Sequence, residues 1–237
     1  MQKTVWITGA GSGIGAAMAR CFAQAGYGTA LTARRADTLT ELARDINNMG
    51  GNSLICPGDV TDRALMAETA RTVAAWGGGL HVLCNNAGLN IPNRRWDQID
   101  WPTWDAVIAT NVTGAMNVIA AALPVMRAQK DGVMIHTSSW AGRFHSPASG
   151  VPYGASKHAL SDLSASLNAQ EGGNGIRSTA LCPAEVATPL MERRPGYDPA
   201  QAAAMIQPED MARTALFVAE MNPQVAMHEI VLAPVRI

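Results

Sequence analysis

Short runs of apolar residues alternate along the chain with longer segments in which apolar residues recur at a helical spacing. Most of the short runs are continuously apolar, which is typical of strands that are buried on both faces of a parallel sheet. The pattern predicts seven strands, at Lys3–Thr8, Gly28–Ala33, Asn52–Cys56, Leu80–Cys84, Gly132–Ser138, Ile176–Cys182 and His228–Ala233.

Six helices are predicted between these strands. The helix over Asp62–Trp76 begins at an acidic cap, and a run of three glycines stops it. Strands that alternate with helices predict βαβ units with right-handed crossovers, so we expect an α/β fold with a doubly wound parallel sheet and helices on both faces. The expected helices are Ile14–Ala25, Ala36–Met49, Asp62–Trp76, Thr103–Gln129, Val151–Ala169 and Pro208–Glu220.

The segment Ala184–Gln207 fits neither pattern. It follows the sixth predicted strand and contains three prolines and one glycine among mixed charges. A long excursion beyond the carboxyl end of a strand often covers a ligand. No linker divides the chain, and its length suits one sizeable core, so we predict a single domain over residues 1–237 with a substrate-covering loop at about 184–207.

The charge balance argues against one class of function. Lys and Arg total 18 and Asp and Glu total 19, so the formal net charge is −1. This balance lacks the excess of positive charge with which proteins bind nucleic acids. We therefore expect no nucleic-acid partner.

No segment suggests a membrane partner or export. The longest apolar candidate, Val112–Met126, is interrupted by Asn117 and Pro124 and fits a buried helix better than a membrane span. The first residues, Met1–Thr8, form no signal-peptide apolar region. The four cysteines are dispersed without Cys-x-x-Cys spacing and the five histidines are dispersed as well, so we expect reduced thiols, no metal site and a cytoplasmic location.

The first predicted strand runs into a glycine-rich turn that opens a helix. Glycine permits a tight turn and a close approach of the backbone to a pyrophosphate, whose charge is favoured by the exposed N–H groups and the dipole of the helix. The alternative is a merely structural glycine turn. We expect contacts with a dinucleotide cofactor from Gly9, Gly11, Ser12, Gly13, Ile14 and Gly15.

The second predicted strand ends in Ala33, Arg34 and Arg35. In dinucleotide-binding folds an acidic residue at this point accepts hydrogen bonds from the adenosine ribose, whereas a basic residue accommodates a 2′-phosphate. The two arginines and the missing acid favour NADP(H), with Arg34 ahead of Arg35, while NAD(H) stays possible. Alternatively, the arginines begin a solvated helix whose N-terminus is favoured by Asp37.

Three further polar groups follow predicted strands. Asp59 and Val60 follow the third strand, and Asn86-Ala87-Gly88 follows the fourth, at the sheet edge where ligands bind in open α/β folds. Ser138 and Ser139 close the fifth strand. We expect these loops to border a cofactor and its substrate.

Tyr153 and Lys157 lie four residues apart at the start of a predicted helix. Residues at this spacing project from one helix face, so the ammonium can stabilise the phenolate and lower the pKa of Tyr153 toward neutral pH. The pair is suited to proton transfer, although the same spacing also occurs by chance on helix surfaces.

In their order along the chain, these residues closely resemble the short-chain dehydrogenase/reductase family, and the resemblance covers almost the whole sequence. It implies a Rossmann-like fold, a homodimer or homotetramer, and Tyr153 as general acid/base. It implies further that Ser139 binds the substrate oxygen, that Lys157 and Tyr153 contact the nicotinamide ribose, and that Asn111 holds a water in a proton relay. Cofactor contacts are also implied at Pro183, Val186 and Thr188.

The sequence departs from the family pattern at three places. The interval from Ser139 to Tyr153 is one residue longer than usual, which leaves Ser138 as a rival for the catalytic serine. The family's Pro-Gly after the sixth strand is Pro183-Ala184 here. The carboxyl end, His228–Pro234, lacks the frequent Val-Asp-Gly-Gly and looks like the branch of NADP-dependent enzymes that act on small hydroxy acids and related alcohols.

Together these observations predict hydride transfer between a nicotinamide cofactor and a small alcohol or carbonyl substrate, with hydroxy acids among the candidates. One alternative is a sensor or scaffold that binds NAD(P) without catalysis, and another is an NAD(H)-dependent alcohol dehydrogenase. A sugar-nucleotide epimerase or dehydratase would need a longer chain.

Substrate contacts are expected from the loops around the predicted catalytic residues. Trp140 and Met191 could equally be packing residues. The basic pair Arg193-Arg194 could bind an acidic substrate or simply face solvent. The candidates are Ser139, Trp140, His145, Tyr153 and Met191, with Arg193, Arg194 and Tyr197 in the excursion.

Overall fold

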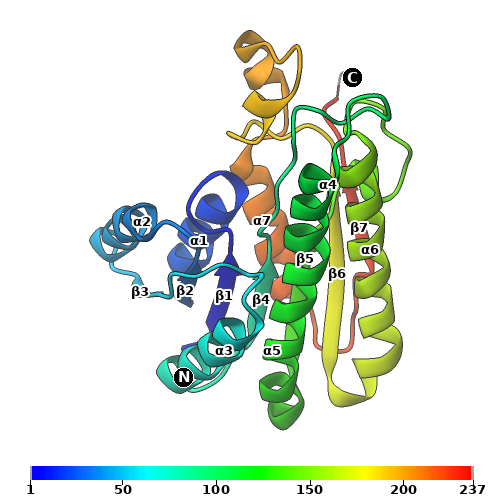
Figure 1. Cartoon of the computed structure of the whole chain (residues 1–237). Helices are drawn as coiled ribbons and strands as arrows, with labels where there is room; N and C mark the ends of the chain where they lie inside the picture. The colour runs from blue at the N-terminus through cyan, green and yellow to red at the C-terminus, as the bar shows by residue number, and fades with distance from the viewer. Residues whose placement is uncertain (1, 236–237) are drawn as a thin grey trace.

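The computed structural model describes residues 2–235, which form one parallel sheet with helices on both faces (Figure 1). The strands are β1 (Thr4–Thr8), β2 (Gly28–Thr32), β3 (Asn52–Ile55), β4 (Val82–Asn85), β5 (Gly132–Thr137), β6 (Ile176–Pro183) and β7 (Glu229–Leu232). All strand pairs are parallel, and the order across the sheet is β3-β2-β1-β4-β5-β6-β7. This order confirms the predicted seven-stranded, doubly wound α/β fold.

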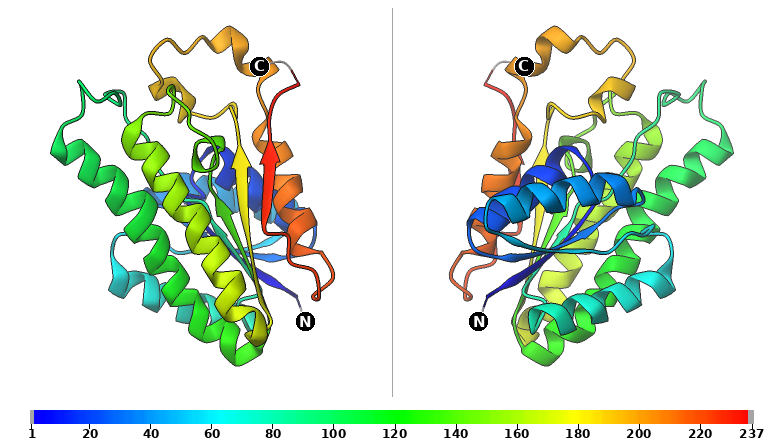
Figure 2. Two further views of the ribbon diagram at one scale, coloured as in Figure 1. Left: turned by 90° about the vertical axis from the view of Figure 1, so that its right-hand side faces the viewer. Right: turned by 90° about the vertical axis from the view of Figure 1, so that its left-hand side faces the viewer.

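Two layers of helices cover the sheet, as the edge-on views show (Figure 2). The helices are α1 (Gly13–Gln24), α2 (Ala36–Asn48), α3 (Arg63–Gly77), α4 (Trp101–Ile108), α5 (Ala115–Gln129), α6 (Val151–Glu171) and α7 (Pro208–Ala219). Apolar residues of α1, α2 and α7 form a core on one face of the sheet, around Phe22 and Met211. Those of α3, α5 and α6 form a second core on the other face, around Met66 and Met126.

The fourth strand begins at Val82 rather than at the predicted Leu80. The side chain of Gln129, at the end of α5, takes the place of a neighbouring strand there. Its Oε1 accepts from the Leu80 N–H at 2.8 Å, and its Nε2 donates to the Leu80 C=O at 2.9 Å. The backbone of Leu80 is therefore satisfied by a side chain, and the strand ladder starts two residues later.

The helix predicted over Thr103–Gln129 is part of a continuous helical run, Trp101–Gln129, with a wider turn in the middle. The run begins after Asp100, whose carboxylate accepts a backbone N–H of the first turn at 2.8 Å. Residues Ala109–Gly114 form a π-helical turn between α4 and α5, and this turn carries Asn111. Turns of this kind are frequent at functional sites.

By length and composition alone, the run Trp101–Gln129 could cross a membrane, since its mean hydropathy reaches 1.6. In this fold the run packs against the sheet, and its apolar side chains buried in the core include Val118, Ile119, Ala122 and Met126. Core helices of α/β domains meet the same criteria of length and hydropathy.

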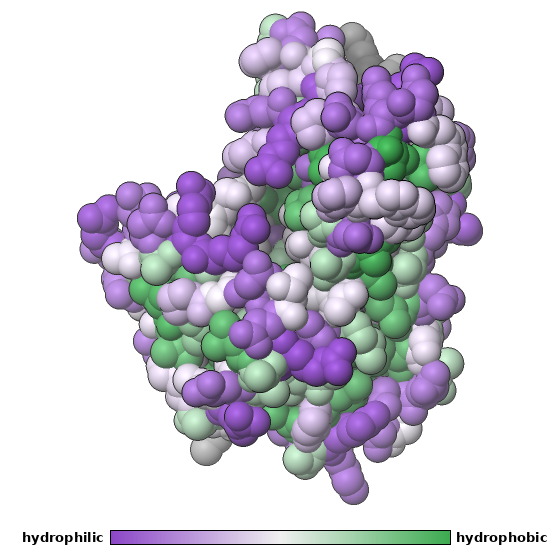
Figure 3. Space-filling model, viewed as in Figure 1, coloured by the Kyte–Doolittle hydropathy of each residue, from purple (hydrophilic) through white to green (hydrophobic). Residues whose placement is uncertain are grey.

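The segment at residues 184–207, called the excursion below, extends beyond the carboxyl ends of the strands (Figure 1, gold to orange). In the space-filling view, hydrophilic residues cover much of it, and the surface is hollowed between it and α2 (Figure 3). A short backbone bridge holds its base. The Ala187 N–H donates to the Ile206 C=O at 2.9 Å, and the Ile206 N–H donates to the Glu185 C=O at 3.0 Å. The two ends of the excursion therefore meet at one point, from which the chain continues into α7.

Candidate active site

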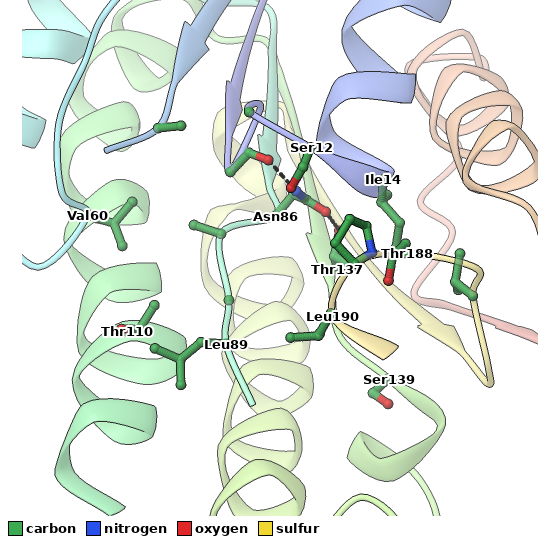
Figure 4. Close-up of a pocket in the computed structure, with 18 of the residues that line it drawn as sticks. Ser12, Ile14, Val60, Asn86, Leu89, Thr110, Thr137, Ser139, Thr188 and Leu190 are labelled. Atoms are coloured by element: carbon green, nitrogen blue, oxygen red, sulfur yellow. Dashed lines mark hydrogen bonds between the residues drawn. The ribbon is translucent and has the colours of Figure 1, made fainter. Parts of the chain in front are cut away.

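A pocket of about 620 Å³ lies at the carboxyl ends of the strands, where the order of the chain changes between β1 and β4 (Figure 4). Ligands bind at such switch points in open α/β sheets. The walls come from the ends of β1 to β6, from α6 and from the excursion. The predicted site residues that line the pocket are Gly9, Gly11, Ser12, Gly13, Ile14, Arg34, Arg35, Asp59, Val60, Asn86, Ala87, Gly88, Ser139, Tyr153, Lys157, Pro183, Val186, Thr188 and Met191.

The turn after β1 brings backbone N–H groups to this pocket. Gly9 and Gly13 have φ angles of 66° and 52°, a left-handed backbone that glycine adopts without strain. A Cβ on Gly11 would lie 2.7 Å from Oγ1 of Thr38, so a larger residue would force that side chain to move. The first turn of α1 has no acidic residue and Ser12 makes no side-chain cap, which leaves the first N–H groups of the helix available to an anion.

A cofactor contact is predicted for Gly15, but this residue does not line the pocket. A Cβ at Gly15 would lie 2.3 Å from the C=O oxygen of Gly9 and 2.7 Å from Nδ2 of Asn86. The glycine thus allows α1 to pack closely against the end of β1.

Asn86 joins the ends of three strands beneath the pocket (Figure 4). Its Nδ2 donates to the Thr8 C=O at 3.1 Å, and its Oδ1 accepts from the Thr137 hydroxyl at 2.9 Å. The Thr8 hydroxyl in turn accepts the N–H groups of Asn86 and Ala87 at 3.0 and 3.1 Å. The side chain of Asn86 therefore fixes β1 and β5 relative to β4, a structural task beyond the cofactor contact predicted for it.

Arg34 and Arg35 lie after β2, and their exposed side chains line one end of the pocket. Within residues 2–235 neither guanidinium is in an ion pair. Ala33 lines the same wall at the point where a ribose-binding acid would lie. Asp59, after β3, accepts from the N–H and the hydroxyl of Thr61 at 2.9 and 2.8 Å, so its carboxylate shapes its own loop.

Three predicted catalytic side chains meet at the other end of the pocket. Tyr153 and Lys157 lie one turn apart on α6, and Nζ of Lys157 is 5.5 Å from the centre of the Tyr153 ring. The same ammonium donates to the Thr137 C=O at 2.6 Å. Ser139 starts the turn that follows β5, and its hydroxyl interacts with the phenol of Tyr153.

Burial governs the ionisation of this cluster. Lys157 is 3% exposed, and burial lowers its pKa to about 8. Burial also raises the pKa of Tyr153, and the Ser139 hydroxyl and the Arg94 guanidinium offset this only in part. The direction for Tyr153 is opposite to the one predicted from the sequence, because lost hydration disfavours the phenolate more than its neighbours favour it. Tyr153 therefore keeps its proton at neutral pH and can donate it.

The two adjacent serines have different partners. The Ser138 hydroxyl donates to the Lys157 C=O at 3.0 Å and lies 2.7 Å from the Ser161 hydroxyl, so it holds β5 to α6. The Ser139 hydroxyl accepts a backbone N–H of the following turn at 3.1 Å and lies beside Tyr153. This arrangement favours Ser139 over Ser138 as the serine that meets a substrate.

Asn111 lies in the π-helical turn behind the pocket wall and is 1% exposed. Its Oδ1 accepts from the Leu89 N–H at 2.8 Å, and its Nδ2 donates to the Leu89 C=O at 2.9 Å and to Ser156 Oγ at 3.0 Å. A Cβ on Gly88 would lie 3.4 Å from Oδ1 of Asn111 and 3.5 Å from Nζ of Lys157, so both side chains approach one point of this loop. Asn111 thus anchors the loop after β4, and its role in a proton relay stays a prediction.

Two of the predicted substrate contacts do not line the pocket. The chain enters a 3₁₀ turn directly after Ser139, and Trp140 packs against Phe144 with ring centres 4.5 Å apart. His145 lines a separate cavity of about 740 Å³. Met191 does line the pocket, from the excursion.

The polar residues of the excursion also differ in whether they line the pocket. Arg193 lines the pocket, whereas Arg194 forms an ion pair with Glu185 and Tyr197 is not part of the pocket wall.

Some residues in or directly behind the pocket wall are not predicted from the sequence. Thr137 directly precedes the two serines at the end of β5, so its position carried a usable signal. Arg94, a buried residue whose charge acts on Tyr153, carried none, because it lies in a long loop without a recognisable pattern. The additional lining residues include Thr32, Thr38, Leu89, Thr110, Thr137 and Leu190.

Comparison with known proteins agrees with this geometry. The sequence model for short chain dehydrogenases matches residues 3–196. The sulfoacetaldehyde reductase of Chromohalobacter salexigens is 32% identical over 243 residues, which cover 100% of this chain and 95% of the relative. The glycine betaine reductase ATRR of Emericella nidulans is 32% identical over 98% of this chain, but the match spans 19% of that longer protein.

A solved structure has the same fold over nearly its whole length. The alcohol dehydrogenase of the archaeon Thermococcus sibiricus, complexed with 5-hydroxy-NADP, has a TM-score of 0.89 and 25% identity, and the match covers 99% of this chain and 97% of the other. Residues 3–196, the span of the family match, include every residue that lines the pocket. The chain belongs to the short-chain dehydrogenase/reductase family of oxidoreductases.

Proposed function

We propose that this protein uses NADP(H) to reduce a small carbonyl compound to an alcohol, or to catalyse the reverse oxidation. The observation that carries the proposal is that one pocket is lined both by the glycine turn at the start of α1 and by Ser139, Tyr153 and Lys157. A dinucleotide site and a proton donor in one cavity are what hydride transfer to a carbonyl requires.

The lining residues fit a dinucleotide that carries an additional phosphate. The N–H groups at the start of α1 suit a pyrophosphate, and Gly9 and Gly11 leave room for it. Arg34 and Arg35 have no carboxylate partner within residues 2–235 and can bind a 2′-phosphate. The complex of the T. sibiricus enzyme with 5-hydroxy-NADP supports this choice. Bound NADPH would supply a hydride to the carbonyl carbon.

The proton of the reaction is assigned to Tyr153. Because burial raises its pKa, Tyr153 carries a proton at neutral pH and can donate it to the carbonyl oxygen. The Ser139 hydroxyl lies beside the phenol and would hold the same oxygen. Lys157, whose ammonium is bonded to the Thr137 C=O, favours the phenolate that remains after the transfer.

Two alternatives keep the fold but change the function. A binding protein without catalysis has no need for a proton donor beside a buried lysine. An NAD(H)-dependent enzyme would leave Arg34 and Arg35 without a 2′-phosphate to bind. The named relatives do not agree on a substrate, since sulfoacetaldehyde carries a sulfonate and glycine betaine a quaternary ammonium.

The test is a panel of small aldehydes and ketones, followed by the absorbance of NADPH and of NADH. The wild-type protein should consume NADPH with at least one carbonyl compound, and Tyr153→Phe should lower kcat by about 10²- to 10⁴-fold, the usual contribution of a positioned proton donor. Tyr197→Phe makes the same change outside the pocket wall and should leave kcat unaltered. A folded Tyr153→Phe protein that binds NADPH and reacts at the wild-type rate would overturn the proposal.

A further inference from the structure

The charged side chains at the catalytic end of the pocket are basic. Lys157 and Arg193 line the same pocket as Tyr153, and the backbone of Arg193 is bonded to Arg94, whose charge acts on Tyr153. Asp59 is the one carboxylate in the described pocket wall, and it follows β3, which is separated from β5 by three strands and lies on the far side of β1. A ligand beside Tyr153 therefore meets positive charge from the pocket wall that the structure describes.

Arg94 adds a buried positive charge behind this wall. The residue is 6% exposed, and it donates from Nε to the Ile91 C=O at 2.6 Å, from Nη1 to the Ala148 C=O at 3.0 Å and from Nη2 to the Arg193 C=O at 3.2 Å. All three acceptors are neutral, and no carboxylate pairs with Arg94 in the described chain. The bonds fix this guanidinium in position without neutralising it.

The same bonds connect three loops around the catalytic end. Ile91 belongs to the loop after β4, Ala148 to the loop before α6, and Arg193 to the excursion. The charge of Arg94 also lies near enough to Tyr153 to favour its phenolate. Arg94 therefore links the backbone of Arg193 to the surroundings of the proton donor.

Acidic residues of the excursion do not cancel this charge. Glu185 forms an ion pair with Arg194. Glu192, next to Arg193, is exposed and does not line the pocket. Arg193 is thus a cation in the pocket wall with no carboxylate in ion-pair distance among residues 2–235.

Resting on the carbonyl reduction proposed above, we propose that the substrate is a small aldehyde or ketone with a carboxylate or sulfonate group, and that Arg193 binds this anionic group. Arg94 acts as a positioning residue, because it holds the backbone of Arg193 and adds a fixed positive potential. The guanidinium fork matches the paired oxygens of such an anion. The substrate is small because the same cavity of about 620 Å³ also has to hold the dinucleotide.

The experiment compares pairs of carbonyl compounds of equal length, one ending in a carboxylate or sulfonate and the other in the corresponding neutral amide. With NADPH, the wild-type protein should reduce the anionic member with a kcat/KM about 10- to 100-fold higher, as expected for a hydrogen-bonded charge pair. Arg193→Gln should remove this preference, because KM for the anionic member should rise much more than KM for the neutral amide. Arg193→Lys should restore part of the preference.

Two control variants isolate the effect. Arg95→Gln removes a neighbouring exposed arginine that pairs with Asp97 and does not line this pocket, so the preference should persist. Arg94→Lys keeps the charge but replaces three separate donor nitrogens with one, which does not reproduce the bonds to Ile91, Ala148 and Arg193. It should raise KM for the anionic substrate more than for the amide.

The outcomes separate this inference from the proposed function. Equal kcat/KM for the two members of each pair, or an unchanged preference in Arg193→Gln, would overturn the anionic substrate while leaving the reductase intact. If no carbonyl compound is reduced, the reductase fails, and a thermal shift with NADPH and a small non-reducible carboxylate still tests Arg193. The carboxylate should raise the melting temperature of the wild type, its amide should not, and a shift that persists in Arg193→Gln would contradict the assignment.

Discussion

Lys157 is a buried lysine, and its burial favours the neutral amine over the charged ammonium. Burial lowers its pKa to about 8, close to the pH of most cells, whereas an exposed lysine would stay charged well beyond that. The ammonium is nevertheless bonded to the Thr137 C=O, and it faces the ring of Tyr153 at 5.5 Å from the ring centre. A charge that is so near to its titration point makes the proposed proton transfer sensitive to mild alkali.

This sensitivity is a testable property at the residue scale. A lysine is charged below its pKa and neutral above it, so kcat/KM for carbonyl reduction should be level near neutral pH and fall as the pH rises through about 8. Arg at this position stays charged, so the decline in Lys157→Arg, relative to its own maximum, should move to higher pH. A wild-type profile that stays level up to about pH 10 would contradict the role of the ammonium.

Arg34 gives a test of cofactor choice. Arg34→Ala should raise KM for NADPH by about 10- to 100-fold, the value of a charged hydrogen bond to phosphate, and change KM for NADH by less than about twofold. Arg44→Ala removes an exposed arginine of α2 that does not line the pocket and should change neither constant. Equal losses for NADPH and NADH in Arg34→Ala would rule out a phosphate contact.

Residues differ in how well the sequence predicts their chemistry. The glycine turn and the spacing of Tyr153 and Lys157 are local patterns, and the structure brings these residues into one pocket. The direction of the Tyr153 pKa shift depends on burial by distant segments, so a pairwise argument from Lys157 missed it. Arg94 was missed for the same reason, since its partners come from three separate loops.

At the scale of elements, the loops around the catalytic end depend on a single glycine. Gly150 precedes α6 with a φ of 83°, and a Cβ there would lie 2.2 Å from the Cβ of Arg94. The backbone of Arg94 also accepts the Val151 N–H at 3.0 Å. The start of the helix that carries Tyr153 is therefore packed directly against the arginine loop.

A pair of glycine variants tests this packing. Gly150→Ala should lower the free energy of unfolding by at least about 2 kcal/mol, because alanine is strained at positive φ and its methyl group collides with Arg94. Gly154→Ala, four residues later inside α6, should be neutral or stabilise by up to about 1 kcal/mol, since the nearest atom to its Cβ is 3.9 Å away. Urea unfolding measures both, and equal midpoints for Gly150→Ala and the wild type would refute the packing.

Helices and strands can be predicted from the sequence where residues close together in the chain determine them. Apolar runs, acidic caps and terminal glycines placed the strands and helices within a few residues. The π-helical turn at Ala109–Gly114 and the late start of β4 were not predictable in this way, because Asn111 and Gln129 shape them through partners far along the chain.

At the scale of the whole molecule, the pocket spans both halves of the sheet. Most of the proposed cofactor contacts follow β1 to β4, with three more at and after the end of β6. Ser139 follows β5, and Tyr153 and Lys157 lie on α6, with the excursion on top. The parallel doubly wound sheet and an excursion over the ligand were predictable from local patterns, whereas the choice of excursion residues that line the pocket depends on tertiary contacts. The single domain and the homodimer or homotetramer stay predictions.

A ligand that touches both halves should stabilise the fold as a unit. At a concentration 100-fold above its Kd, NADPH should add about 2.7 kcal/mol, which for a chain of this length raises the melting temperature by roughly 5–10 °C. At the same NADPH concentration, the shift for Arg34→Ala should be several degrees smaller. An absent shift in the wild type at millimolar NADPH would contradict the proposed site.

The bridge at the base of the excursion also bears on how this protein could change over evolution. Because Glu185 and Ile206 meet there, the chain between them starts and ends at nearly the same point in space. Residues 187–205 could be exchanged for the corresponding segment of a relative without altering any strand. Such a graft would have to retain the proposed cofactor contact Thr188, the bond from Arg94 to the carbonyl at position 193 and an ion-pair partner for Glu185. The proposed substrate contacts Met191 and Arg193 would then form a transplantable module, attached to a cofactor scaffold that can stay unchanged.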